Sequence, residues 1–159
     1  MKIRTGLGYD IHRLEEGRRL FLGGVEIPSP KGLIGHSDGD CLIHAIIDAL
    51  LGAIGERDIG QIFPDQDPEY KDIRSTELLK DVIGKLKKNE IEIVNIDSIV
   101  IAEKPRLASY ISQMKEVLCP ILGVEKDDLG IKAKTNEGLG GVGKGEAIAS
   151  WAQVLVEKT

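Results

Sequence analysis

The sequence predicts an α/β (α+β) fold in which a mixed β-sheet is backed by helices on one face. Three observations support this fold class: strand-like stretches recur along the chain, amphipathic helical stretches lie between them, and no repeat or low-complexity linker divides them. The 159 residues, of which 42% are hydrophobic, suffice to bury one core. We therefore expect residues 1–159 to form a single domain.

Four stretches are typical of strands, because apolar residues alternate loosely within them and Gly or Pro bounds them. The stretch RRLFLGGVEIP divides into two short strands joined by a Gly23–Gly24 turn and stopped by Pro28. The strand IEIVNIDSIVIAEKP is expected to halt at Pro105. The four stretches are residues 2–12, 18–28, 91–105 and 128–135.

The C-terminal stretch AIASWAQVLV is ambiguous between strand and helix. As a strand it would place Ala152, Val154 and Val156 on one face, and a largely apolar set that begins with Trp151 on the other. Two apolar faces favour a strand that is buried on both sides, with a helix as the alternative.

Three stretches predict helices. Asp38 or Asp40 can cap a mostly buried helix that runs to about Ile54. A second helix, capped by Ser75, carries an apolar face and ends at Asn89, and a third is expected to stop at Pro120. Residues 55–74, rich in Gly, Pro and Asp without periodicity, predict a long functional loop.

Composition excludes several classes of protein. The net charge of -5 and the 4% of aromatic residues argue against a nucleic-acid partner, which would need a basic surface or stacking platforms. No apolar run is long enough for a membrane span, and the first residues have no signal core, so we expect a cytoplasmic protein. Cys41 and Cys119 lie far apart and are interpreted as buried thiols of a reducing compartment.

Histidine and aspartate residues in the first third of the chain indicate a metal site. Asp10 and His12 lie two apart on a predicted strand, so both side chains point to one face. Asp40, His44 and Asp48 recur every four residues as a polar stripe on an apolar helix. Two imidazoles and one carboxylate suit a catalytic Zn²⁺ with an open fourth position, although an Asp-x-His pair alone is more often a surface or turn feature.

Three further segments could contact phosphate or hydroxyl groups. His36 and Ser37 precede a predicted helix, where they could bind an anion or serve only as a helix cap. Asp residues at 58, 65 and 67 could bind hydroxyl groups or a hard cation, or simply form turns. The run GLGGVGKGE could cradle phosphate, but Gly145 stands where a complete P-loop needs Ser or Thr.

Together these segments resemble the 2-C-methyl-D-erythritol 2,4-cyclodiphosphate synthase family of the non-mevalonate isoprenoid pathway. The similar motifs follow the family's order over nearly the whole chain: GYDIHRL, GLIGHSDGDCLIHAIIDALLGA, DIGQIFPDQDP, KPRL and KAKTNEGLG…GKGE. The resemblance implies a homotrimer with active sites between neighbouring subunits. It also implies a CDP-linked substrate, 4-diphosphocytidyl-2-C-methyl-D-erythritol 2-phosphate, whose 2-phosphate attacks its own β-phosphorus and expels CMP.

The resemblance also implies roles for individual residues. Zn²⁺ is expected on Asp10, His12 and His44, and Mg²⁺ or Mn²⁺ on the diphosphate through Glu137. His36 and Thr135 match the positions that stabilise the transition state. The substrate-binding positions implied are Ser37, Asp58, Ile59, Gly60, Phe63, Pro64, Asp65, Gln66, Asp67, Ala102, Lys104, Pro105, Arg106, Leu107, Ala133, Lys134, Asn136, Gly141 and Lys144.

Within that set, residues 63–67 are expected to close over the substrate, and segments 102–109 and 133–137 to form the cytidine and phosphate pocket. Three positions depart from the family's common pattern: Lys134 replaces a hydroxyl residue, Gly141 an aromatic residue near an axial cavity, and Lys144 an arginine. These departures argue against an isoprenoid diphosphate on the trimer axis. Two other functions fit the same residues, a metal-dependent phosphohydrolase and a non-catalytic trimer that binds isoprenoid or nucleotide diphosphates.

Overall fold

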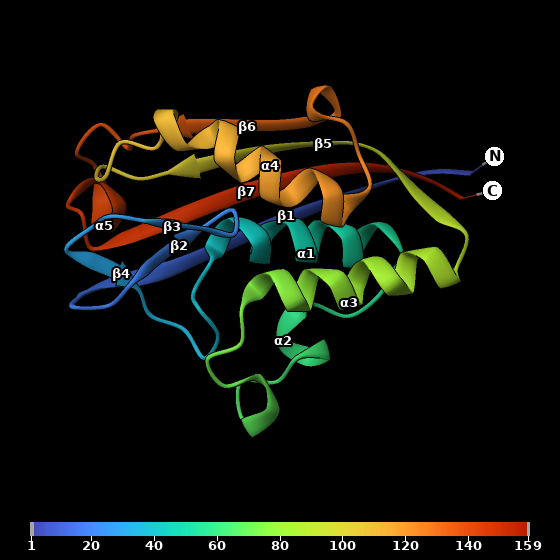
Figure 1. The fold of residues 1–159 in the computed structure, drawn as a ribbon, viewed down its shortest axis with the longest axis horizontal. Helices are drawn as coiled ribbons and strands as arrows, with labels where there is room; N and C mark the ends of the chain where they lie inside the picture. Colours follow the sequence, from blue (N-terminus) through green and yellow to red (C-terminus); the bar gives the residue numbers. More distant parts are fainter. Residues whose placement is uncertain (1, 159) are drawn as a thin grey trace.

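A computed structural model describes residues 2–158, which form one mixed sheet with helices on one face (Figure 1). The sheet has the order β4-β1-β7-β5-β6, in which only the β5–β6 pair is parallel. Its strands are β1 (Lys2–Glu16), β4 (Lys31–Leu33), β5 (Ile91–Ile101), β6 (Leu129–Lys134) and β7 (Ala147–Lys158). The predicted fold class is therefore confirmed, and the ambiguous C-terminal stretch is a strand.

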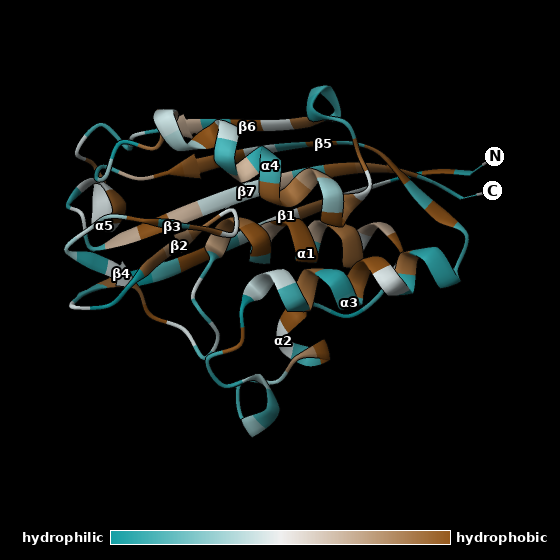
Figure 2. Ribbon diagram, viewed as in Figure 1, coloured by the Kyte–Doolittle hydropathy of each residue, from teal (hydrophilic) through white to brown (hydrophobic). Residues whose placement is uncertain are grey.

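Three long helices cover one face of the sheet, and α1 (Cys41–Ala53), which is buried except at Asp48 and Gly52, lies against β1 and β7. Figure 2 shows α1 as largely hydrophobic, whereas α3 (Ser75–Lys88) alternates along its length. The third, α4 (Ile111–Leu122), lies near β6. A hairpin of β2 (Leu20–Leu22) and β3 (Val25–Ile27) matches the predicted Gly-Gly turn.

The contact between β1 and α1 is close because glycines face the helix. A Cβ atom at Gly6 would lie 1.8 Å from the carbonyl oxygen of Ala49, and one at Gly8 would lie 1.9 Å from that of Ala45. Only a residue without a side chain leaves room for the helix backbone there. The helix is consequently held close to the strand segment that carries Asp10 and His12.

The opposite face of the sheet bears exposed apolar side chains, which corrects the expectation that β7 is buried on both sides. The rings of Tyr9 of β1 and Trp151 of β7 contact each other at a tilt of 50°, with 4.6 Å between their centroids, yet both residues remain more than two-fifths exposed. Leu7 is 64% exposed on the same strand. Helices cover the other face only, so within residues 2–158 no helix packs on this side of β7.

The structure corrects three predicted boundaries. Strand β5 ends at Ile101 rather than Pro105, because its partner β6 ends opposite at Lys134. Helix α4 continues past Pro120. The missing N–H of Pro120 removes only one backbone hydrogen bond in the last turn, and Leu122 beyond it packs in the core. Ser75 is the first residue of α3 and not its cap, because the Asp38 carboxylate accepts its amide hydrogen instead.

The predicted long loop contains two short turns of helix, α2 (Ile59–Ile62) and η1 (Pro68–Tyr70), which protrude beyond α3 in Figure 1. The remaining short elements are η2 (Ala108–Tyr110), η3 (Lys126–Asp128) and α5 (Gly140–Gly143). Cys41 and Cys119 are buried, as predicted. Within residues 2–158, no helix has the length and apolar character needed to cross a membrane.

Candidate metal centre and substrate site

Three side chains from β1 and α1 bring ligand atoms to one point. The Oδ2 atom of Asp10 lies 2.8 Å from Nε2 of His12 and 3.1 Å from Nδ1 of His44, and the two nitrogens are 3.1 Å apart. Neighbouring ligands of a tetrahedral Zn²⁺ with bonds near 2 Å lie about 3.3 Å apart. The predicted Asp10–His12–His44 group therefore forms and has the spacing of a metal site.

Hydrogen bonds on the far side of each imidazole direct a lone pair to this point. Nδ1 of His12 donates to the carbonyl oxygen of Ile34 at 2.6 Å, which leaves Nε2 as the atom with a lone pair. Nε2 of His44 lies 2.9 Å from the hydroxyl of Ser75 and 3.1 Å from that of Ser37. Metal-binding histidines are commonly held in this way.

The electrostatics of the group also favour a cation. Burial alone would raise the pKa of Asp10, but the contacts with His12 and His44 outweigh it and the pKa is lowered. Burial alone would lower the pKa of His12, but the Asp10 carboxylate outweighs it and the pKa is raised. A carboxylate that faces two imidazole nitrogens stabilises positive charge between them. The donor set of two nitrogens and one oxygen fits Zn²⁺.

A cavity of about 310 Å³ opens onto the metal group. Its wall consists of predicted site residues together with Gly35, Tyr70 and Leu78. The sequence did not indicate these three residues, because none of them carries a charge or is a typical metal ligand. The predicted members of the wall are Asp10, His12, His36, Ser37, His44, Ile59, Gly60, Phe63 and Asp65. Residues from before α1 and from the 55–74 segment thus share one site.

The 55–74 segment is tied to the residues before α1. Nε2 of His36 donates to the carbonyl oxygen of Asp67 at 2.9 Å, and the amide of Asp72 donates to the carbonyl of His36 at 2.8 Å. The ring of Tyr70 packs edge-on against Phe63. Asp58 caps α2 through the amide of Gln61. These contacts hold the segment that carries residues 63–67 over the cavity.

Of the predicted polar stripe on α1, only His44 reaches the metal group. The buried carboxylate of Asp40 caps the helix instead and accepts the amides of Gly23, Gly24 and Ile43. Asp48 accepts the amide of Ile59 at 2.7 Å and so anchors α2. The stripe therefore combines one ligand with two structural carboxylates.

The buried carboxyl group of Asp40 predicts that the unfolding free energy of the protein depends on pH. Burial, followed by the charge of Asp38, raises the pKa of Asp40 from 3.8 to about 6. Because the folded state then binds the proton more tightly than the unfolded chain, this contribution to stability is present below pH 4 and lost as pH rises through 6. We expect the unfolding free energy of wild type, relative to Asp40→Asn, to fall by about 2–3 kcal/mol between pH 4 and 7. Urea titrations of both proteins across that range measure it, and a pH-independent difference would contradict it.

Arg18 braces the segment that carries His36 and Ser37. Its guanidinium donates to the carbonyl oxygens of Leu33, Gly35 at 3.1 Å and Ser37 at 2.9 Å. Arg18 lies between β1 and β2, outside the sequence motifs described above, so only the three-dimensional structure identifies this contact.

An Arg18→Lys variant should lose this brace, because an ammonium cannot match the fork of a guanidinium. We expect about 1–2 kcal/mol of destabilisation and about a tenfold loss of substrate affinity. Thermal unfolding and substrate titration measure these effects. Arg19→Lys is the matched control. Arg19 makes an exposed ion pair with Glu26 and its guanidinium lies 5.0 Å from the centroid of the Phe21 ring, contacts that an ammonium can also make, so the substitution should change stability by less than about 0.5 kcal/mol. Equal effects of the two substitutions would contradict the role of Arg18.

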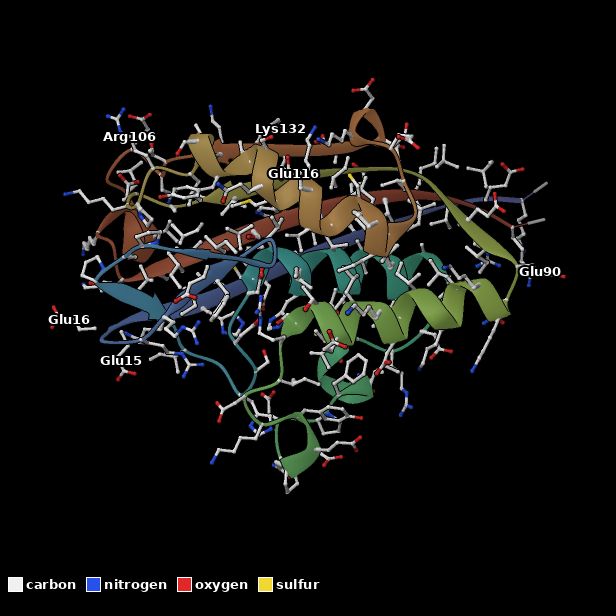
Figure 3. All side chains as sticks on the ribbon, in the orientation of Figure 1. Glu15, Glu16, Glu90, Arg106, Glu116 and Lys132 are labelled. Carbon is white, nitrogen blue, oxygen red and sulfur yellow. The ribbon has the colours of Figure 1, made fainter. Side chains whose placement is uncertain are left out.

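The predicted residues of the 102–107 and 133–135 segments gather in a second region, at the ends of β5 and β6. A cavity of about 440 Å³ is lined there by Ala102, Glu103, Pro105, Arg106, Leu107, Ala108, Ala133, Lys134 and Thr135. Lys104 and Lys144 line a neighbouring cavity of about 790 Å³. Figure 3 shows the side chain of Arg106 pointing outward from this end of the molecule.

Within one chain these two regions line separate cavities. Glu137 is exposed in a left-handed conformation (φ 53°), and its amide donates to the hydroxyl of Thr135 at 3.3 Å. Neither residue lines the cavity at the metal group. Asp58, Pro64, Gln66, Asp67, Asn136 and Gly141 also lie outside the walls of these three cavities. A single subunit therefore places the expected zinc ligands and the expected Glu137 ligand in different regions.

Comparison with known proteins gives a consistent result over the full chain. Residues 3–157 match the YgbB family. The 2-C-methyl-D-erythritol 2,4-cyclodiphosphate synthase of Caldicellulosiruptor bescii is 53% identical over 96% of this chain and 98% of its own length, and that of Clostridium acetobutylicum is 53% identical over 97% and 99%.

Solved structures have the same fold. A CDP complex from Plasmodium falciparum matches with a TM-score of 0.86 and 34% identity, over 99% of this chain and 97% of its own. The bifunctional IspDF protein of Campylobacter jejuni matches with a TM-score of 0.94 and 39% identity, and this chain spans 43% of its length. Because the family match and the relatives cover nearly every residue that forms the site, the chain belongs to the YgbB family.

Proposed function

We propose that this protein is a phosphorus–oxygen lyase, a 2-C-methyl-D-erythritol 2,4-cyclodiphosphate synthase. The observation that carries this proposal is the convergence of Asp10, His12 and His44 beside a cavity, in a chain about half identical to proteins named for that activity. The substrate would be 4-diphosphocytidyl-2-C-methyl-D-erythritol 2-phosphate. An oxygen of its 2-phosphate attacks the β-phosphorus, the bond from that phosphorus to the oxygen of the α-phosphate breaks, and CMP leaves.

The chain's own residues would position the reacting groups. Zn²⁺ on Asp10, His12 and His44, with Mg²⁺ or Mn²⁺ on Glu137, would neutralise negative charge on the phosphoryl oxygens. His36 and Ser37 line the cavity beside the expected zinc ligands, where N–H and O–H groups can hold a phosphate. The remaining wall, from Ile59 to Asp65, would orient the erythritol hydroxyls and exclude water, which would otherwise open the ring product.

The cytidine would bind in the second region, where backbone groups of residues 102–107 and 133–136 can read the base edge. The solved CDP complexes among the similar structures support a nucleotide of this kind. Because one chain separates this region from the metal group, we propose that the active site forms between neighbouring subunits of a homotrimer. The exposed apolar face around Leu7 and Trp151 supplies a surface suited to such an assembly. We place the enzyme in the cytoplasm, with no nucleic-acid or membrane partner.

Phosphorus NMR of the purified protein with the cytidyl substrate tests the proposal. We expect CMP and the cyclic diphosphate in equal amounts, and a loss of turnover of about a thousandfold or more with chelator or in a His44→Ala variant. An open-chain phosphate product would instead establish a hydrolase. Binding without any turnover would establish a diphosphate-binding protein.

A further inference from the structure

A buried chain of polar groups leads from the metal centre to the start of α3. Ser75 is fully buried, and its hydroxyl lies 2.9 Å from Nε2 of His44 and also contacts Oδ1 of Asp38. Asp38 is only 8% exposed and accepts the amide of Ser75 at 3.0 Å. Neither residue belongs to the expected ligand set or to the wall of the cavity.

The direction of the hydrogen bonds in this chain follows from the carboxylate at its end. Asp38 accepts the amides of Asp40 and Ser75 and the guanidinium of Arg74, and an ionised carboxylate has no hydrogen to donate. The hydroxyl of Ser75 must therefore donate to Asp38 and present its lone pairs to His44. Nε2 of His44 then carries a hydrogen, and Nδ1, which faces Asp10 and His12, is the nitrogen left to bind the metal.

The hydroxyl of Ser37 does not determine which nitrogen of His44 carries the hydrogen. Its hydroxyl lies 3.1 Å from Nε2 of His44, and its other contact is the amide of Gly39 at 3.4 Å. No carboxylate holds this hydroxyl in one orientation, so it can either donate or accept. Only Ser75 has its polarity set by a buried anion.

We propose that Asp38 and Ser75 are positioning residues that hold His44 in the Nε2-protonated tautomer, and so preset Nδ1 as a ligand of the metal. The inference rests on the metal site of the proposed function. It goes beyond that function because it assigns the selection of the ligand atom to two residues that touch neither metal nor substrate. Outer hydrogen-bond partners of this kind typically change metal affinity by about tenfold to a hundredfold.

Zinc affinity, measured by competition with a chromophoric chelator and without substrate, separates this inference from turnover. We expect Ser75→Ala to bind Zn²⁺ about tenfold to a hundredfold more weakly than wild type. Asp38→Asn should weaken zinc similarly, and the double variant should lose little more than either single one, because both act through one hydrogen-bonded chain. Additive losses of zinc affinity would show that Asp38 and Ser75 act separately, and would overturn the inference.

Ser98→Ala is the matched control. Ser98 is also buried, and its hydroxyl donates to the carbonyl of Gly130 at 2.7 Å, on β5 and β6 away from the metal group. It should lower stability about as much as Ser75→Ala while leaving zinc affinity unchanged. Equal loss of zinc binding in both variants would show a general effect of stability and overturn the inference.

Nitrogen-15 NMR of the metal-free protein reads the tautomer directly. We expect His44 of wild type and Ser98→Ala to show the Nε2–H form, and His44 of Ser75→Ala to show a mixture. An Nδ1–H form in wild type, or an unchanged tautomer in Ser75→Ala, would overturn the inference even if turnover established the synthase. A protein that binds no zinc would overturn the metal site itself.

Discussion

A mixture of two inactive variants should recover activity. His44→Ala removes an expected zinc ligand and Glu137→Ala the other expected metal ligand, so each variant alone should lose turnover by about a thousandfold. In mixed trimers of the proposed assembly, a site between two subunits would be intact when its metal side comes from the Glu137→Ala chain and its other side from the His44→Ala chain. Random assembly of equal amounts gives this pairing in about a quarter of the sites, and hence about a quarter of wild-type activity.

Denaturation and refolding of the variants together, followed by turnover assays, measures this recovery. The control is the same two proteins refolded separately and then combined, which should remain inactive if the trimers do not exchange subunits. No recovery in correctly mixed trimers would mean that each subunit builds its own site. The experiment thus tests the separation of the two regions that a single chain displays.

The second large effect is expected from a single methyl group at Gly8. An alanine there would place Cβ 1.9 Å from the carbonyl oxygen of Ala45 and 2.8 Å from the amide nitrogen of Ala49. These are backbone atoms that cannot rotate away, so α1 must move away from β1. We expect a loss of about 3 kcal/mol or more in unfolding free energy, or roughly 6–12 °C in melting temperature.

The same displacement should weaken zinc binding, because β1 carries Asp10 and His12 whereas α1 carries His44. Calorimetry and chelator competition measure the two effects on one preparation. Gly52→Ala is the control, since no atom lies within 4 Å of a Cβ there and alanine favours a helix, so it should stabilise by about 0.5–1 kcal/mol. A Gly8→Ala protein as stable as wild type would show that the helix and strand are not in rigid contact.

Local patterns in the sequence predict much of the fold and the core of the metal group. The period of two places Asp10 and His12 together, and the apolar run around His44 identifies its helix, so both elements could be inferred from their own residues. That they face each other depends on Gly6 and Gly8, whose importance lies in the absence of a side chain. Patterns of residue type do not reveal such a close contact.

Other parts of the site depend on contacts between distant segments. The sequence suggests Ser75 as a helix cap, whereas its hydroxyl bridges Asp38 and His44, because α3 begins beside the start of α1. Arg18 likewise acts on a segment about fifteen residues further along the chain. The roles of Thr135 and Glu137 remain predictions, since they depend on an assembly beyond one chain.

The position of β7 bears on how the chain acquires its structure during synthesis. Among the described strands β7 is the last to leave the ribosome, yet it lies between β1 and β5 and pairs with both along most of its length. Until then, β1 and β5 expose unpaired backbone edges, and such edges promote aggregation. The strand that carries Asp10 and His12 thus pairs with β7 only when translation of this domain is nearly finished.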